Sequence, residues 1–271
     1  MENENYLTLA IEKYVKHMRQ ERLSKRTIEM YVWVIHQLAK VDTRFYRLSN
    51  ETIQNFILES ESGSAQNIKI NALKKFFEVN HPDKRIKVFI RPRKERKLIE
   101  VMTQKEVLSI INSIEHPKQK AIIAGLYFHG FRLNELLNLK YQHIDREKNL
   151  IMIRDGKGAK DRYVPLNEYW IDYLKEFARF AGHKKGYNDF IFRPYSESSV
   201  RAILKRKAIE LGIKKKVYPH LLRDCYATHL LQQGIDTRFI QEILGHENIK
   251  TTQKYLHISA VNISQIALKI A

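Results

Sequence analysis

Six polar residues between positions 132 and 255 have the types needed for phosphoryl transfer when the protein itself supplies every reacting group. Arginines can neutralise phosphate oxygens through paired hydrogen bonds. Lysine or histidine can protonate a departing alkoxide, and tyrosine can attack phosphorus to form a covalent phosphotyrosine. No acidic cluster typical of a two-metal nuclease stands out, so the pattern favours a route without a metal ion or other cofactor. The six residues are Arg132, Lys157, His220, Arg223, His246 and Tyr255.

Each of these residues, taken singly, also has an ordinary structural interpretation. Arg132 follows a glycine at a predicted helix start and could hold an anion there, but a surface salt bridge with Glu135 is the more common outcome. His220 and Arg223 are one helical turn apart on a shared face, as a phosphate clamp or as an ordinary surface pair. Lys157 fits a solvated loop, His246 a helix cap, and Tyr255 a core aromatic. The functional interpretation therefore rests on their combination.

The charge of the chain indicates a polyanionic partner. Its 271 residues carry 48 Lys and Arg against 30 Asp and Glu, a formal charge of +18. Nucleic acid is the leading partner, although an anionic membrane surface or ribosomal RNA could also attract this charge. Cys225 is the only cysteine, which excludes an intrachain disulfide and a cysteine-rich metal site. With no signal peptide and no apolar membrane span, we expect a soluble, cytoplasmic protein associated with the nucleoid.

Residues 1–82 are predicted to form a small all-helical domain. Apolar residues from Leu7 to Met18 follow helical spacing, Thr27 is a plausible N-cap of a second helix, and Ser49 opens a third. A fourth helix is expected over about 65–77. Residues 83–100 follow as a basic linker that could track a phosphate backbone or simply be solvated.

Residues 101–271 are predicted to form a mostly helical second domain with a small antiparallel sheet. Thr103 caps its first helix, a second runs over about 118–128, and Gly130 provides a turn. Strands over 150–154 and 162–166 flank the glycine-containing turn DGKGAKD. Further helices are expected over 168–181, 197–211, 220–233, 237–244, 248–256 and 259–270. The fold class is therefore mainly α, in two domains.

The order and spacing of these motifs resemble the tyrosine recombinase (integrase) family, and look most like its compact Xer-type members. In the N-terminal part, LSKRTIEMY (23–31) looks like the opening of the family's helical core-binding domain, which is SAM-like. The more specific motifs are a G-x-R box, a GKG hairpin, an H-x-x-R box, an LGH box, and a tyrosine nine residues beyond that last histidine: 130–132, 156–158, 220–223, 244–246 and Tyr255. Asp224 departs from the pattern, because many relatives carry a basic residue there.

The resemblance implies a role for each matching residue. Arg132 and Arg223 would bind the phosphate, Lys157 would protonate the 5′-hydroxyl leaving group, and Tyr255 would be the nucleophile. His220 and His246 would assist binding and proton transfer, with Glu135 in a supporting position. The DNA-contacting residues would be Ser24, Lys25, Arg26, Thr27, Arg91, Arg93, Lys94, Lys160 and Arg162.

The resemblance also implies a double-stranded DNA substrate with specific core sites. Residues 259–271 carry an apolar helical stripe, which either docks into a neighbouring protomer of a homotetramer or packs on its own domain. An accessory recombinase or DNA-bending protein could also take part. Integration, excision, inversion and dimer resolution are all open. The alternative functions are a DNA-binding protein of this fold without catalysis, a type IB topoisomerase-like enzyme, and an RNA-binding protein.

Overall fold

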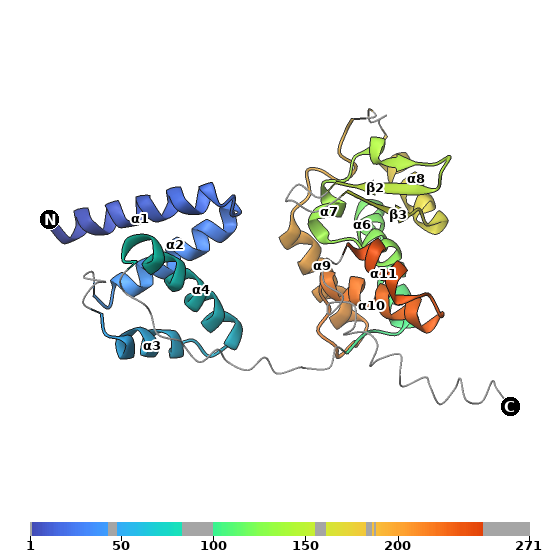
Figure 1. Ribbon diagram of the computed structural model, residues 1–271. Helices are drawn as coiled ribbons and strands as arrows, with labels where there is room; N and C mark the ends of the chain where they lie inside the picture. The colour runs from blue at the N-terminus through green and yellow to red at the C-terminus, as the bar shows by residue number, and fades with distance from the viewer. Residues whose placement is uncertain are drawn as a thin grey trace. The chain divides into compact units, whose positions relative to one another are not determined.

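The chain divides into two compact units, Met1–Leu98 and Ile99–Ala271 (Figure 1). The computed structural model describes residues 2–42, 48–82, 100–154, 161–182, 186 and 188–245. The predicted linker, 83–100, lies almost wholly outside these ranges, so the predicted domain boundaries stay a prediction.

The first unit is an all-helical domain, as predicted. Its four described helices are α1 (Glu2–Gln20), α2 (Lys25–Ala39), α3 (Asn50–Leu58) and α4 (Gly63–Asn80). Helical spacing brings one apolar face of each helix into a common core that includes Tyr14, Met18, Ile35 and Phe76. The Tyr14 hydroxyl donates to the Ala72 carbonyl at 2.8 Å, which satisfies its polar atom inside that core.

Serine side chains cap three helices of the first unit. Ser49 caps α3 as predicted, by accepting from the Thr52 N–H at 3.0 Å. The predicted cap at Thr27 is wrong, because α2 begins at Lys25 and Ser24 accepts from the Thr27 N–H at 3.1 Å. Thr27 is thus the third helical residue, whose N–H needs a side-chain acceptor.

The second unit is mostly helical around a small sheet. Its elements are α5 (Gln104–Asn112), α6 (Pro117–His129), α7 (Leu133–Leu137), the 3₁₀ turn η2 (Tyr141–His143), β1 (Ile144–Asp145), β2 (Leu150–Ile153), β3 (Arg162–Pro165), α8 (Glu168–Ala181), α9 (Glu197–Glu210), α10 (Pro219–Gln232) and α11 (Thr237–Leu244). Thr103 caps α5 as predicted, and α8 and α11 have the predicted bounds. The helices predicted over 248–256 and 259–270 lie outside the described residues.

The sheet is antiparallel with the order β1-β2-β3. Ile151 pairs with Val164, and Ile153 with Arg162. The sequence predicted β2 and β3 but missed β1, which has only two residues. Alternate residues of β3 are buried, so Arg162 and Val164 face the interior while Tyr163 is exposed. This alternation brings a charged side chain into the core.

α6 is the central helix of the second unit and packs against both α8 and α10 (Figure 1). Its close contact with α8 depends on Gly125, where a Cβ atom would lie 2.8 Å from Nε1 of Trp170. That Nε1 donates to the Ala121 carbonyl at 2.8 Å. In the part of the chain that the structure describes, no helix is both long and apolar enough to cross a membrane.

Candidate active site

The carboxylate of Glu135 lies among three arginines from different parts of the second unit. Arg132 Nη1 donates to Oε1 at 2.7 Å. Arg162, on β3, donates through Nη1 to Oε1 at 2.9 Å and through Nη2 to Oε2 at 2.7 Å. Arg223 Nη1, from α10, lies 4.0 Å from Oε2. The G-x-R and H-x-x-R boxes therefore meet at one carboxylate, and these four residues form what we call the arginine cluster.

The same three arginines also hold the C-terminal end of α11. Three consecutive carbonyls accept one hydrogen bond each: Ile243 from Arg162 Nε at 2.7 Å, Leu244 from Arg223 Nη2, and Gly245 from Arg132 Nη2 at 3.0 Å. The last carbonyls of a helix have no partner within it and carry a partial negative charge, so cations stabilise them. The arginine cluster thus anchors the start of the LGH box, and His246 follows directly in the chain.

Two glycines make this geometry possible. Gly130 ends α6 with a φ of +60°, and a Cβ there would lie 2.5 Å from the ring of Tyr226. Its carbonyl accepts from Arg223 Nη1 at 2.7 Å. Gly245 ends α11 with a φ of +62°, and a Cβ there would lie 2.9 Å from Cδ of Arg162. Both positions require the left-handed backbone that glycine adopts without strain.

Glu135 remains ionised although its side chain is only 7% exposed. Burial alone raises the pKa of this carboxyl, but hydrogen bonds and charge from Arg162 and Arg132 outweigh it, so the net pKa lies below its ordinary value. The backbone N–H of Arg132 adds a further bond to Oε2 at 2.8 Å. A buried carboxylate is stable here because positive groups surround it.

The cluster arginines differ in their access to a substrate. The Arg132 side chain is 39% exposed, whereas that of Arg223 is 0% exposed. His220 lies at the start of α10, one turn before Arg223, and is exposed. The sequence therefore placed these two residues correctly on one helix but did not predict their opposite burial. Arg132 is the cluster arginine that a phosphate can reach in this arrangement.

The prediction of Arg162 as a DNA-contacting residue does not fit its placement. Its side chain is 7% exposed, and its guanidinium is engaged by Glu135 and Ile243. A guanidinium committed to buried acceptors cannot also bind an external phosphate backbone. The sequence missed this role because a basic hairpin flank ordinarily indicates solvent exposure.

Other reactive side chains close to the cluster are poor nucleophiles. Burial raises the pKa of the Cys225 thiol to about 12, and burial raises the pKa of the Tyr226 phenol to about 12. Both groups therefore stay protonated near neutral pH. Among the described residues, no set of three or more His, Cys, Asp or Glu side chains is placed to hold a metal ion.

Several predicted site residues lie outside the described residues, and their roles stay predictions. They are Lys157, Lys160, His246, Tyr255, Arg91, Arg93, Lys94 and the segment 259–271. Of the predicted DNA contacts in the first unit, Lys25 and Arg26 are exposed at the start of α2. Ser24 and Thr27 are half-buried and hydrogen-bond each other through their hydroxyls at 2.7 Å.

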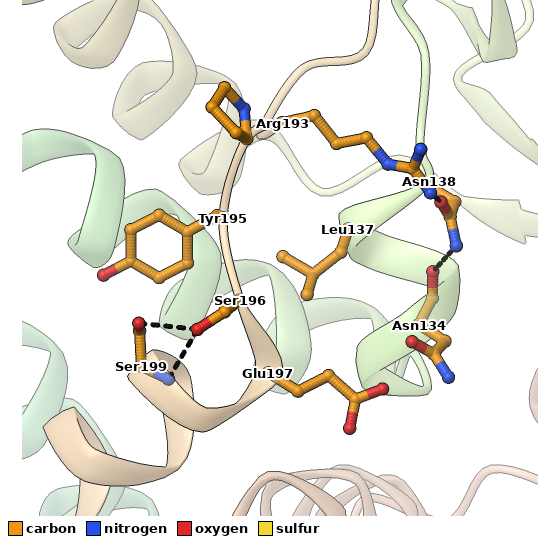
Figure 2. Close-up of a pocket in the computed structure, with 9 residues that line it drawn as sticks. Asn134, Leu137, Asn138, Arg193, Tyr195, Ser196, Glu197 and Ser199 are labelled. Carbon is orange, nitrogen blue, oxygen red and sulfur yellow. Dashed lines mark hydrogen bonds between the residues drawn. The ribbon is translucent and has the colours of Figure 1, made fainter. Parts of the chain in front are cut away.

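An open hollow of about 610 Å³, with both apolar and polar side chains in its lining, lies beside α7, the helix that carries Glu135. Figure 2 shows Arg193 reaching Asn138 at the end of α7, with Ser196 and Ser199 at the start of α9. This hollow has no local signal in the sequence, because Arg193 and Asn138 are 55 residues apart. Its lining of amide, hydroxyl and guanidinium groups suits hydrogen bonding to a polar ligand.

Comparison with known proteins gives a consistent result along the chain. The model of the Phage integrase family matches residues 100–261. Tyrosine recombinase XerA of Pyrococcus furiosus is 32% identical over 266 residues, covering 94% of this chain and 91% of that protein. Tyrosine recombinase XerD of Staphylococcus aureus is 28% identical over 284 residues, covering 94% and 96%.

Solved structures share the architecture. A crystal structure of XerA recombinase is 27% identical with a TM-score of 0.57, and the match covers 96% of this chain and 97% of that one. The Tn1549 transposon integrase in complex with transposon right-end DNA reaches a TM-score of 0.76 at 16% identity, covering 95% and 99%. XerH site-specific recombinase in a post-cleavage complex with a palindromic difH substrate has a TM-score of 0.72 at 22% identity, covering 89% and 78%. The last two show likeness of fold alone.

Proposed function

The chain belongs to the phage integrase family of tyrosine recombinases and is a site-specific DNA recombinase, and we propose that Tyr255 is the residue that cleaves and rejoins the strand. The phenolic oxygen of Tyr255 attacks the scissile phosphorus, and the bond from phosphorus to the 5′-oxygen breaks. The protein is then linked to the 3′-phosphate, and Lys157 gives a proton to the departing 5′-oxygen. Reversal with another 5′-hydroxyl rejoins the strand.

The observation that carries this proposal is the meeting of Arg132, Glu135 and Arg223 at the carbonyl end of α11. The residue after that end is His246, and Tyr255 is nine residues further on. Because this segment begins next to Arg132 and Arg223, we infer that it can bring His246 and Tyr255 to a phosphate bound near these arginines. The phosphotyrosyl bond conserves the energy of the phosphodiester, so this route requires no ATP and no metal ion.

The two arginines contribute differently to phosphate binding. Arg132 is accessible and can contact a non-bridging oxygen directly. Arg223 is covered, and its two Nη atoms donate to Gly130 and Leu244, so direct contact requires these bonds to yield. Its buried charge acts on the phosphate in either case, because little solvent screens it. His220 is exposed one helical turn before Arg223 on α10, and it can donate a hydrogen bond to the phosphate.

DNA is the partner of the enzyme, and its binding and assembly are part of the proposal. The charge of +18 supports backbone contacts, which we assign to Lys25, Arg26, Lys160 and the basic stretch containing Arg91, Arg93 and Lys94. We also propose a homotetramer on paired core sites, with residues 259–271 docked on a neighbouring protomer. The enzyme would act in the cytoplasm at the nucleoid, alone or with an accessory recombinase or bending protein.

The direct test is covalent trapping in EDTA. Nicked suicide duplexes that span the flanks of the protein's own gene would be incubated with the wild type, Tyr255→Phe and Tyr226→Phe. We expect a protein–DNA adduct on denaturing gels that only Tyr255→Phe abolishes. An adduct lost in Tyr226→Phe instead would overturn the choice of nucleophile. Binding without any adduct would favour the noncatalytic DNA-binding alternative.

A further inference from the structure

Arg162 has no part in the chemistry proposed above, yet all three of its guanidinium nitrogens donate hydrogen bonds within the second unit. Its Nη1 and Nη2 bind both oxygens of Glu135, and its Nε binds the Ile243 carbonyl. Its stem lies against Gly245, where even a methyl group would be 2.9 Å from Cδ. One side chain therefore joins three elements: β3, α7 and the end of α11.

The burial of Arg162 excludes a direct role at the phosphate. The side chain is 7% exposed, as is that of Glu135. By contrast, Arg132 is 39% exposed and binds the same carboxylate through a single Nη atom and its backbone N–H. Arg162 thus donates one hydrogen bond to each oxygen of Glu135, and it shares this carboxylate with Arg132, the accessible arginine.

We propose that Arg162 is a positioning residue for strand cleavage. It holds Glu135 in place relative to the end of α11, the point in the chain that His246 follows. Through Glu135, it also holds the guanidinium of Arg132. The inference rests on the proposed function of Arg132 at the phosphate. Without Arg162, Glu135 would have Arg132 as its remaining close cationic partner, since Arg223 lies 4.0 Å away. Arg132 would then be drawn toward the carboxylate and away from the substrate, and the Ile243 carbonyl would lose its donor.

Lysine cannot replace this arginine. A guanidinium presents donors in a fixed planar fork, which here binds two carboxylate oxygens and a carbonyl at once. An ammonium keeps the charge but cannot span these three acceptors in one plane. Arg162→Lys therefore separates the geometry of the contact from its charge, and it also serves as the milder variant should Arg162→Met unfold.

The test compares Arg162→Lys and Arg162→Met with Arg179→Met, an exposed arginine on α8. Single-turnover adduct formation on the suicide duplex gives the cleavage rate, and fluorescence anisotropy with the same duplex gives the dissociation constant. We expect cleavage to fall about 100-fold in both Arg162 variants, the scale of a misplacement near 1 Å, while the dissociation constant changes less than about threefold. Arg179→Met should match the wild type in both.

A substrate with a neutral methylphosphonate at the scissile position separates positioning from general damage. Arg132 has no phosphate charge to neutralise there, so the deficit of Arg162→Lys relative to wild type should shrink on this substrate. An equal deficit on both substrates, or wild-type cleavage by Arg162→Lys and Arg162→Met, would overturn the inference. If Tyr255→Phe keeps the wild-type adduct, the proposed function fails instead, whatever the Arg162 variants do.

A double-variant cycle tests whether Arg162 acts through Glu135. Glu135→Gln removes the carboxylate that Arg162 shares with Arg132, so Glu135→Gln/Arg162→Lys should cleave no more slowly than Glu135→Gln alone, within about twofold. Deficits that multiply in the double variant would show that the two residues act independently and would refute the proposed path.

Discussion

Replacing Glu135 by glutamine should strongly destabilise the second unit, because the carboxylate compensates buried positive charge. Each Glu135 oxygen accepts two hydrogen bonds: Oε1 from Arg132 Nη1 and Arg162 Nη1, and Oε2 from the Arg132 N–H and Arg162 Nη2. In either orientation the amide of glutamine turns one of these acceptors into a donor that faces two donors. Arg162 and Arg223 would then be buried without the negative charge of Glu135.

Removing one partner of a buried ion pair typically costs about 3–5 kcal/mol, and we expect a loss of this size in the free energy of unfolding. Urea titration of the full chain measures it, with Trp170 as the fluorescent reporter because it is fully buried in the second unit. Trp33, in the first unit, is 57% exposed, and it would be replaced by phenylalanine in every protein of this Glu135 comparison. Glu115→Gln, at an exposed position between α5 and α6, is the control and should be neutral.

The pH dependence of this effect has a fixed sign. The pKa of Glu135 is lowered in the folded protein, so its stabilisation is present above the ordinary carboxyl value of 4.5 and is lost as the pH falls through the lowered pKa. The difference between wild type and Glu135→Gln should therefore be constant from pH 7 to 5.5 and shrink below 4.5. A loss below about 1 kcal/mol at pH 7, the range of exposed ion pairs, would refute the reasoning.

Three further predictions concern other parts of the two units. Gly212→Ala places alanine at a positive φ with open space around it, so it should cost about 1 kcal/mol and leave adduct formation unchanged. Gly245→Ala adds a close contact with Arg162 to the same backbone strain, so it should cost more than Gly212→Ala and also slow adduct formation. Equal cleavage rates for the two variants would contradict the close contact with Arg162. Burial lowers the pKa of His129 to about 3, so the unfolded chain binds a proton at this residue before the folded protein does. The stability of the wild type should therefore fall as the pH drops from 6.5 to 5, by up to about 1.4 kcal/mol per pH unit. His129→Gln should flatten this slope in urea titrations, and an unchanged slope would show that His129 is not its source. Ser24→Ala should lower the stability of the first unit by about 1 kcal/mol through loss of the α2 cap, measured from Trp33 fluorescence, and a neutral result would mean that the bond to the Thr27 N–H contributes nothing.

Much of the fold could be predicted because it depends on local patterns. The helical spacing of apolar residues, the cap at Thr103 and the turn at Gly130 are all confirmed. The cap at Ser24 was misassigned to Thr27, since two hydroxyl residues three apart both fit an N-cap. The strand β1 was missed because two residues carry no periodicity.

The candidate site was harder to predict, because its geometry depends on contacts between distant residues. The ion pair of Arg132 with Glu135, the more common outcome for such an arginine taken singly, is present, but the carboxylate is buried rather than at the surface and also binds Arg162, 27 residues away. Sequence spacing relates His220 to Arg223, yet only packing determines that one is exposed and the other buried. The contacts of the arginines with the last carbonyls of α11 have no sequence signal at all, since any residue supplies a carbonyl.

The charges of the arginine cluster fit the transition state of strand cleavage better than the bound substrate. Three guanidinium groups and one carboxylate leave two positive charges in the cluster. A phosphodiester brings one negative charge, and attack by a phenolate adds a second, so the pentavalent state carries two. A site with this surplus gains more attraction as the reaction proceeds than on binding alone, which is the condition for a faster chemical step. In the proposed mechanism, Glu135 therefore does more than stabilise the fold: it lets three arginines pack together while keeping their surplus charge matched to the reacting phosphate.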